Sequence, residues 1–152
     1  MNLWEIHPAV IHFPIAFLIG GVVLDLFGHR KESLVRAATY LILAGIAAAV
    51  VAIATGFLAF YTVPKNHTQH AHDWIMYHLY ANLTAAVLFV IVGIARWRRP
   101  AAVSPIVRVL GMVAVLVLSV GAYIGGDVVY HGGMGIDEAI LKPGLRPGAE
   151  KS

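Results

Sequence analysis

The chain has 152 residues, of which 59% are apolar and only 12% are charged, and it contains no cysteine. Because a soluble domain carries about 25% charged residues, this composition excludes an ordinary cytosolic enzyme and a disordered chain. The lack of cysteine excludes disulfides, thiolate metal ligands and a cysteine nucleophile, so a metal site would have to use histidine, carboxylate, methionine or tyrosine. The net charge of +3 does not indicate nucleic acid as a partner, since the basic residues flank apolar segments.

Four long apolar segments follow one another along the chain, each close to the roughly 20 residues that a helix needs to cross a bilayer. They cover residues 9–27, 36–61, 74–95 and 106–124. They lack the alternating pattern of barrel strands, so we expect helices. The short connections favour an all-α, integral membrane four-helix bundle with up-down-up-down topology. We predict a transmembrane domain over residues 1–136 and an extramembrane tail over residues 137–152, in contact with the lipid bilayer and with no nucleic acid.

The basic residues predict how these spans are oriented. Seven of them lie beside the connections between spans one and two and between spans three and four: Arg30, Lys31, Arg36, Arg96, Arg98, Arg99 and Arg108. The positive-inside rule places these two connections in the cytoplasm. We therefore predict a multi-pass protein of the bacterial inner membrane with both termini in the periplasm. Asp25, near the cytoplasmic end of the first span, is expected to pair with Arg30 or Arg36.

Histidines gather at the predicted outer ends of the spans. Of the eight in the chain, seven lie there: His7, His12, His67, His70, His72, His78 and His131. His67 and His70 are typical of a solvated loop. His12 and His78 lie inside apolar segments, where an imidazole costs free energy unless it is paired or ligated.

The positions of these histidines predict two layers of ligands. His12 and His78 lie at similar depth on spans one and three, which can be diagonal in a bundle, and two facing imidazoles can ligate a haem iron from both sides. His7 and His131 form the predicted outer layer, which would hold a second haem or a smaller metal ion, with His72 as the competing ligand. The glycine pairs at 125–126 and 132–133 are expected to let the chain bend back over the end of the bundle.

Three motifs resemble a known family. Residues 7–16, HPAVIHFPIA, are similar to the HPxxVHFPIA opening of the bacterial DUF2231 membrane proteins. His78 and Asn82 match a histidine followed four residues later by asparagine in the third span. The closing GGDVVY and GMGI at residues 125–130 and 133–136 resemble GGxLVYxxGxGV, although the family pattern places its histidine where Gly132 stands. The resemblance covers roughly residues 5–136 and implies a four-helix membrane protein that is similar to small b-type membrane cytochromes.

The leading functional hypothesis is a membrane-embedded haem b electron-transfer subunit with one or two haems near the periplasmic side. It would exchange electrons with a redox protein, with a larger membrane complex at the outer face, or with quinone. Two alternatives remain: a histidine-rich copper, zinc or iron site, and a cofactor-free accessory subunit of a larger membrane complex. No Ser-His-Asp, phosphate-loop or paired-carboxylate pattern is present, so we assign no catalytic residue, and an electron-transfer component is favoured over a stand-alone enzyme.

Overall fold

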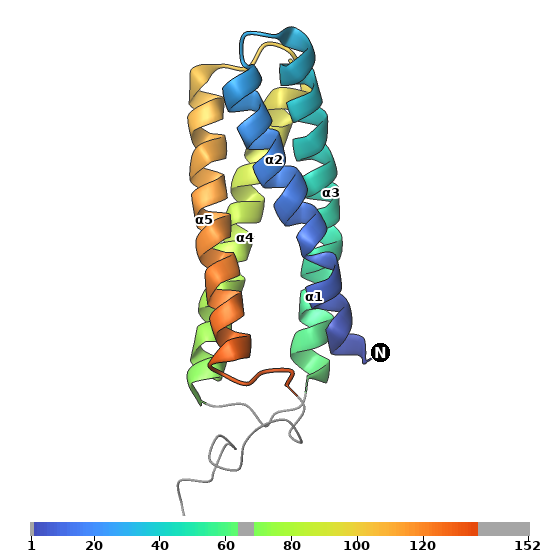
Figure 1. Cartoon of the computed structure of the whole chain (residues 1–152), viewed down its shortest axis with the longest axis vertical. Coiled ribbons are helices and arrows are strands. Elements are labelled where there is room, and N and C mark those ends of the chain that lie inside the picture. The colour runs from blue at the N-terminus through green and yellow to red at the C-terminus, as the bar shows by residue number, and fades with distance from the viewer. Residues whose placement is uncertain (1, 64–68, 137–152) are drawn as a thin grey trace, which may run out of the picture.

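A computed structural model describes residues 2–63 and 69–136, which form a four-helix antiparallel bundle (Figure 1). Its elements are a 3-10 turn, η1 (Leu3–Glu5), and the helices α1 (Ile6–Val10), α2 (His12–Gly28), α3 (Glu32–Thr62), α4 (Gln69–Trp97) and α5 (Pro105–Tyr130). Helices α2 and α4 each pack against both α3 and α5, so α2 and α4 are diagonal to each other. The predicted all-α four-helix membrane bundle is confirmed, whereas the predicted tail at residues 137–152 lies outside the described residues.

The four long helical segments are apolar enough to cross a membrane and extend beyond the predicted spans. They cover Leu3–Gly28, Glu32–Thr62, Ala71–Trp97 and Pro105–Tyr130. A helix as long as α3, with 31 residues, measures about 46 Å, which exceeds the roughly 30 Å of hydrocarbon. Large apolar side chains point outward from the bundle, such as Val50, Ile94 and Leu116. Because lipid rather than water suits such a surface, the protein is a multi-pass membrane protein.

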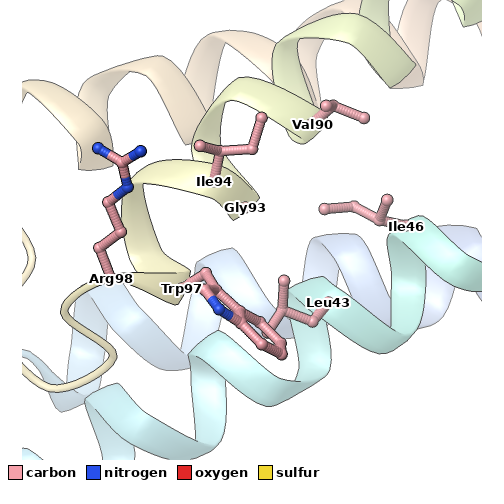
Figure 2. Close-up of a pocket in the computed structure, with 7 residues that line it drawn as sticks. All are labelled: Leu43, Ile46, Val90, Gly93, Ile94, Trp97 and Arg98. Atoms are coloured by element: carbon pink, nitrogen blue, oxygen red, sulfur yellow. The ribbon is translucent and has the colours of Figure 1, made fainter.

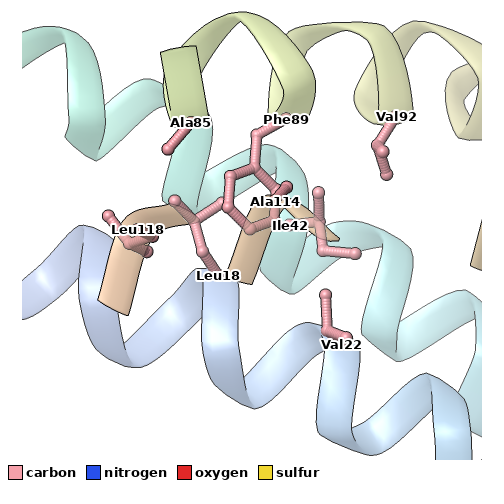
Figure 3. Close-up of a cluster of buried hydrophobic side chains, with 8 residues drawn as sticks. All are labelled: Leu18, Val22, Ile42, Ala85, Phe89, Val92, Ala114 and Leu118. Atoms are coloured by element: carbon pink, nitrogen blue, oxygen red, sulfur yellow. The ribbon is translucent and has the colours of Figure 1, made fainter. Parts of the chain in front are cut away.

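The centre of the bundle is a compact apolar core. Its buried side chains come from all four long helices (Figure 3): Leu18, Val22, Ile42, Ala85, Phe89, Val92, Ala114 and Leu118. Helices α2 and α3 approach closely because Gly21 and Gly45 leave room. A Cβ atom at either position would lie 2.7 Å from a side-chain carbon of the facing helix. This core holds the middle of the bundle together and leaves both ends to be closed by other groups.

A second apolar cluster closes the end of the bundle where the chain begins. Val63, Ala71, Val128 and Met134 are buried there, beside Trp4, Trp74 and Ile75. Met134 reaches this cluster because the chain after α5 turns back across the end of the bundle (Figure 1). Gly133 and Gly135 make the turn, with φ angles of +72° and +79° that favour glycine. The chain therefore bends back as predicted, but of the four glycines expected to allow it only Gly133 has a positive φ angle: Gly125 and Gly126 lie inside α5, and Gly132 has none.

A buried ion cluster closes the opposite end. The Asp25 carboxylate accepts hydrogen bonds from Arg96 at 3.1 and 3.2 Å and from Arg108 at 3.0 Å. Arg96, only 2% exposed, also donates to the Thr39 hydroxyl, so the cluster joins all four long helices.

The predicted pairing of Asp25 with Arg30 or Arg36 is therefore wrong. Asp25 faces the interior of the bundle, where Arg96 from the end of α4 and Arg108 from the start of α5 reach it. Arg36 instead pairs with Glu32, one turn earlier on the exposed side of α3. Arg30 and Arg36 are close to Asp25 in the chain, but closeness in the chain does not determine the ion pair. The direction in which each side chain leaves its helix determines it.

Candidate functional site

The half of the bundle that contains the N-terminus holds a pair of histidines from opposite sides. His7 lies on α1 and His78 on α4, and the centres of their rings are 6.5 Å apart. The two ring planes are nearly perpendicular, with an angle of 85°. Both side chains are half-buried. Two imidazoles that meet at this distance inside a membrane bundle form the candidate site, because histidine within the membrane is costly without a partner or a ligand.

Each ring is anchored through its Nδ1 atom to a backbone carbonyl of a neighbouring helix. The Nδ1 atom of His7 lies 3.0 Å from the Ala52 carbonyl oxygen on α3. The Nδ1 atom of His78 lies 2.9 Å from the Gly121 carbonyl oxygen on α5. A carbonyl oxygen can only accept, so a neutral ring in this position carries its proton on Nδ1 and keeps a lone pair on Nε2. In that tautomer the Asn82 side-chain nitrogen, 3.2 Å from the His78 Nδ1 atom, does not donate to it. Histidines that bind metals show the same arrangement, in which a carbonyl or carboxylate fixes the ring through its other nitrogen.

Asn82 supports His78 from the next turn of α4. Its side-chain nitrogen donates to the His78 carbonyl oxygen at 2.8 Å. The amide packs directly on the backbone of α5, since a Cβ atom at Gly121 would lie 2.7 Å from the Asn82 nitrogen. The spacing of four residues therefore places both side chains on the face of α4 that meets α5. The two residues of the histidine–asparagine motif thus lie side by side, with the Asn82 side-chain nitrogen 3.2 Å from the His78 Nδ1 atom.

Glycines provide the surfaces on which the two imidazole rings lie. A Cβ atom at Gly125 would lie 2.6 Å from the Cε1 atom of His78, and one at Gly56 would lie 3.1 Å from the Cε1 atom of His7. From sequence alone these glycines indicate only helix packing or a bend. Their spacing could not reveal this contact, because the ring comes from another helix.

Replacing Gly125 with alanine is expected to push the His78 ring away from Gly121 and to lower the stability by about 1–3 kcal/mol, the cost of overpacking a tight contact. Gly20→Ala is the matched control, because nothing lies within 4 Å of a Cβ atom there. That variant should be neutral or slightly stabilising, since alanine favours helix over glycine. Thermal unfolding in detergent, followed by circular dichroism, measures both. Equal midpoints for the two variants would show that the His78 ring does not depend on Gly125.

The structure brings His7, not His12, opposite His78. The His12 side chain is exposed, so the expectation that it is buried is wrong. Five residues along a helix correspond to a rotation of about 140°, so His7 and His12 cannot both face the interior. Haem ligation by His12 with His78 has no support from this placement, and the ligand pair proposed below uses His7.

The predicted outer ligand layer is not assembled in the described structure. His72 and His131 are both exposed. The Nδ1 atom of His131 lies 2.7 Å from the Asp127 carboxylate, one turn earlier on α5. Within residues 2–63 and 69–136, no three histidine or acidic side chains come together in a way that could hold a metal ion. His67 and the side chain of His70 lie outside the described residues.

The number of ligands that the pair supplies can be compared with the number that each cofactor needs. A structural zinc ion takes four protein ligands and a catalytic one takes three, whereas a haem iron needs only two axial ligands from the protein. With metal–nitrogen bonds of about 2.0–2.1 Å, two imidazoles on opposite sides of one metal have ring centres about 6 Å apart. The observed separation of 6.5 Å agrees with this value. This separation suits any metal held between the two rings, and the number of ligands that the pair supplies, two, is the number that a haem iron takes from a protein.

Comparison with known proteins gives one match. A family model described as "Predicted membrane protein (DUF2231)" matches residues 4–138. No curated protein and no solved structure matches the chain. The matched range includes the four long helices and both members of the His7–His78 pair. The resemblance to b-type cytochromes stays a prediction.

Proposed function

We propose that this chain, which belongs to the DUF2231 family of predicted membrane proteins, is an electron-transfer subunit that binds haem b between His7 and His78. The observation that carries the proposal is the ring pair itself. Two imidazoles from opposite sides of the bundle lie 6.5 Å apart, and each keeps its Nε2 lone pair because its Nδ1 atom is bonded to a carbonyl. The proposal replaces His12 by His7 and retains a single haem.

The protein side of this function is to hold two imidazoles in a fixed orientation. A bound haem b would supply a one-electron carrier. Ligation by two histidines leaves no position for oxygen, so it favours electron transfer over oxygen chemistry. The bonds to the Ala52 and Gly121 carbonyls fix the tautomer of each ring and increase the basicity of its Nε2 atom.

The position of the pair suggests where electrons would enter or leave. His7 and His78 lie in the half of the bundle that contains the N-terminus, opposite the basic connections. Exposed tyrosines surround this half, among them Tyr77 and Tyr80 on α4 and Tyr123 on α5. In the proposed orientation this half faces the periplasm, where a redox protein, a larger membrane complex or a quinone headgroup would exchange electrons with it.

A pyridine haemochrome spectrum of the purified protein, combined with metal analysis, tests the proposal. We expect one haem b for each chain and a low-spin spectrum in both oxidation states, because both axial positions are taken by imidazole. Copper or zinc in stoichiometric amount without haem would favour the metal-handling alternative. Protein that is folded and free of both, after expression with added haem precursor, would overturn the proposal in favour of an accessory subunit.

We also propose that both termini face the periplasm. Alkaline phosphatase fused after Ser152 should be active, and the same enzyme fused within residues 98–104 should be inactive, because it folds to an active form only outside the cytoplasm. The physical reason is the cluster of basic residues at that connection. Expression levels of both fusions, measured by immunoblot, are the control. The opposite pattern of activity would reverse the orientation and place the histidine pair on the cytoplasmic side.

A further inference from the structure

An apolar groove runs between α3 and α4 toward the basic end of the bundle. Its main cavity has a volume of about 370 Å³ and is lined by Leu43, Ile46, Val90, Ile94 and Trp97, with Arg98 at its end (Figure 2). A second cavity of about 90 Å³ shares Ile46 and Val90 with the first. Its lining reaches Ile53 on α3 and Ala86 on α4 and also includes Leu18 on α2. We call these two neighbouring cavities, which share two lining residues, the α3–α4 groove.

The groove exists because α3 and α4 face each other with little side-chain volume between them. Gly93 contributes no side chain to α4, and a Cβ atom there would lie 2.5 Å from the Cδ1 atom of Ile46. The backbones therefore approach at Gly93, while Trp97 and Leu43 stand beside this contact and form the walls (Figure 2). A hollow on the outer surface of a membrane bundle is exposed to lipid chains.

The length of the groove matches one leaflet of a bilayer. From Arg98 to Ala86 the chain rises by about 18 Å at 1.5 Å per residue. Half of the hydrocarbon core measures about 15 Å. An acyl chain that starts at the headgroup level beside Arg98 would therefore reach the end of the groove near the middle of the membrane. Trp97 lies at the same level as Arg98, where tryptophan is enriched at membrane interfaces.

Arg98 is the arginine in the lining of the main cavity, and Asp25 does not hold its charge. Arg96 and Arg108 are both held by Asp25. Within the part of the chain that the structure describes, Arg98 has no carboxylate partner. Its guanidinium is directed away from the apolar lining (Figure 2), as expected for a side chain that extends toward the headgroups.

We propose that the α3–α4 groove binds an anionic phospholipid, with one acyl chain between Ile46 and Val90 and the phosphate at Arg98. Basic residues at the ends of apolar clefts between membrane helices are known to select anionic headgroups. The site lies at the opposite end of the bundle from the histidine pair, so this inference does not depend on haem binding.

Native mass spectrometry of the purified protein in detergent, with added dioleoyl phosphatidylglycerol or dioleoyl phosphatidylcholine, tests the charge. We expect one tightly retained phosphatidylglycerol per chain and weaker retention of phosphatidylcholine. Arg98→Gln should weaken the retention of phosphatidylglycerol about fivefold and leave that of phosphatidylcholine unchanged. Arg99→Gln is the matched control, since Arg99 is an exposed neighbour that does not line the groove. Equal retention of the two lipids, or equal effects of the two substitutions, would overturn the proposal.

A second pair of variants tests the apolar part of the site. Val90→Phe adds volume inside the groove and should reduce lipid retention, because Val90 lines both cavities. Ile91→Phe adds a ring on an exposed position beside the groove and should leave retention unchanged. Circular dichroism confirms that both variants are folded. Unchanged lipid retention in Val90→Phe would show that the groove does not hold this lipid. The same conclusion would follow if a neutral quinone displaced the lipid and Arg98→Gln had no effect.

Discussion

Replacing His78 with alanine is expected to remove haem b from the purified protein, with occupancy falling at least tenfold, and His7→Ala should do the same. Each substitution removes one of two axial nitrogens, and haem with a single axial imidazole is held weakly and becomes high-spin. Loss of a group that only supports a ligand already lowers metal affinity by 10- to 100-fold. Absorbance of the Soret band relative to protein, after co-purification, measures the occupancy.

His12→Ala and His131→Ala are the matched controls. Both side chains are exposed, and neither belongs to the ring pair. Both variants should keep the occupancy and the low-spin spectrum of the natural protein. If His12→Ala loses haem and His7→Ala keeps it, the result would contradict ligation by His7 and would support the pairing of His12 with His78 that the sequence predicts. Circular dichroism separates loss of haem from loss of fold, because the central core between the long helices does not involve these histidines.

Replacing Asp25 with leucine is expected to lower the free energy of unfolding by about 3–5 kcal/mol, because it leaves a buried arginine without its counter-charge. Arg96 is only 2% exposed, so solvent does not reach its guanidinium to replace the carboxylate. Unfolding in mixed micelles with increasing dodecyl sulfate, followed by helix content, measures the loss. Glu32→Gln is the control, since the Arg36–Glu32 pair is exposed and within one helix, where such pairs contribute about 0.3–0.5 kcal/mol.

A double variant distinguishes the loss of charge balance from the loss of packing. In Asp25→Leu with Arg96→Met, both buried charges are absent, and Arg108 is partly exposed and can turn toward the headgroups. This double variant should be more stable than Asp25→Leu alone, as observed when buried ion clusters are replaced by apolar side chains. If the double variant is the less stable of the two, the cluster stabilises the bundle by packing rather than by pairing of charges.

The composition and the four apolar segments were sufficient to predict the architecture, without knowledge of any tertiary contact. In hydrocarbon every backbone N–H and C=O must be bonded within its own segment, so a 20-residue apolar run can only be a helix. Short connections then made neighbouring helices antiparallel. The placement of most histidines at one end also followed from the sequence, because position along a span sets depth. His78 was recognised by its depth and Asn82 by its spacing of four residues from His78, and the structure places both beside α5.

The tertiary structure alone decided which groups meet. His7 and His12 have similar depth, but their directions around the helix differ by about 140°, and only packing against α3 turned His7 inward. Asp25 likewise met Arg96 and Arg108, which are far from it in the chain. Gly56 and Gly125 contact the imidazole rings of His7 and His78, and these contacts join different helices. Depth in the membrane is a property of the sequence, whereas the rotation of each helix depends on all its neighbours at once.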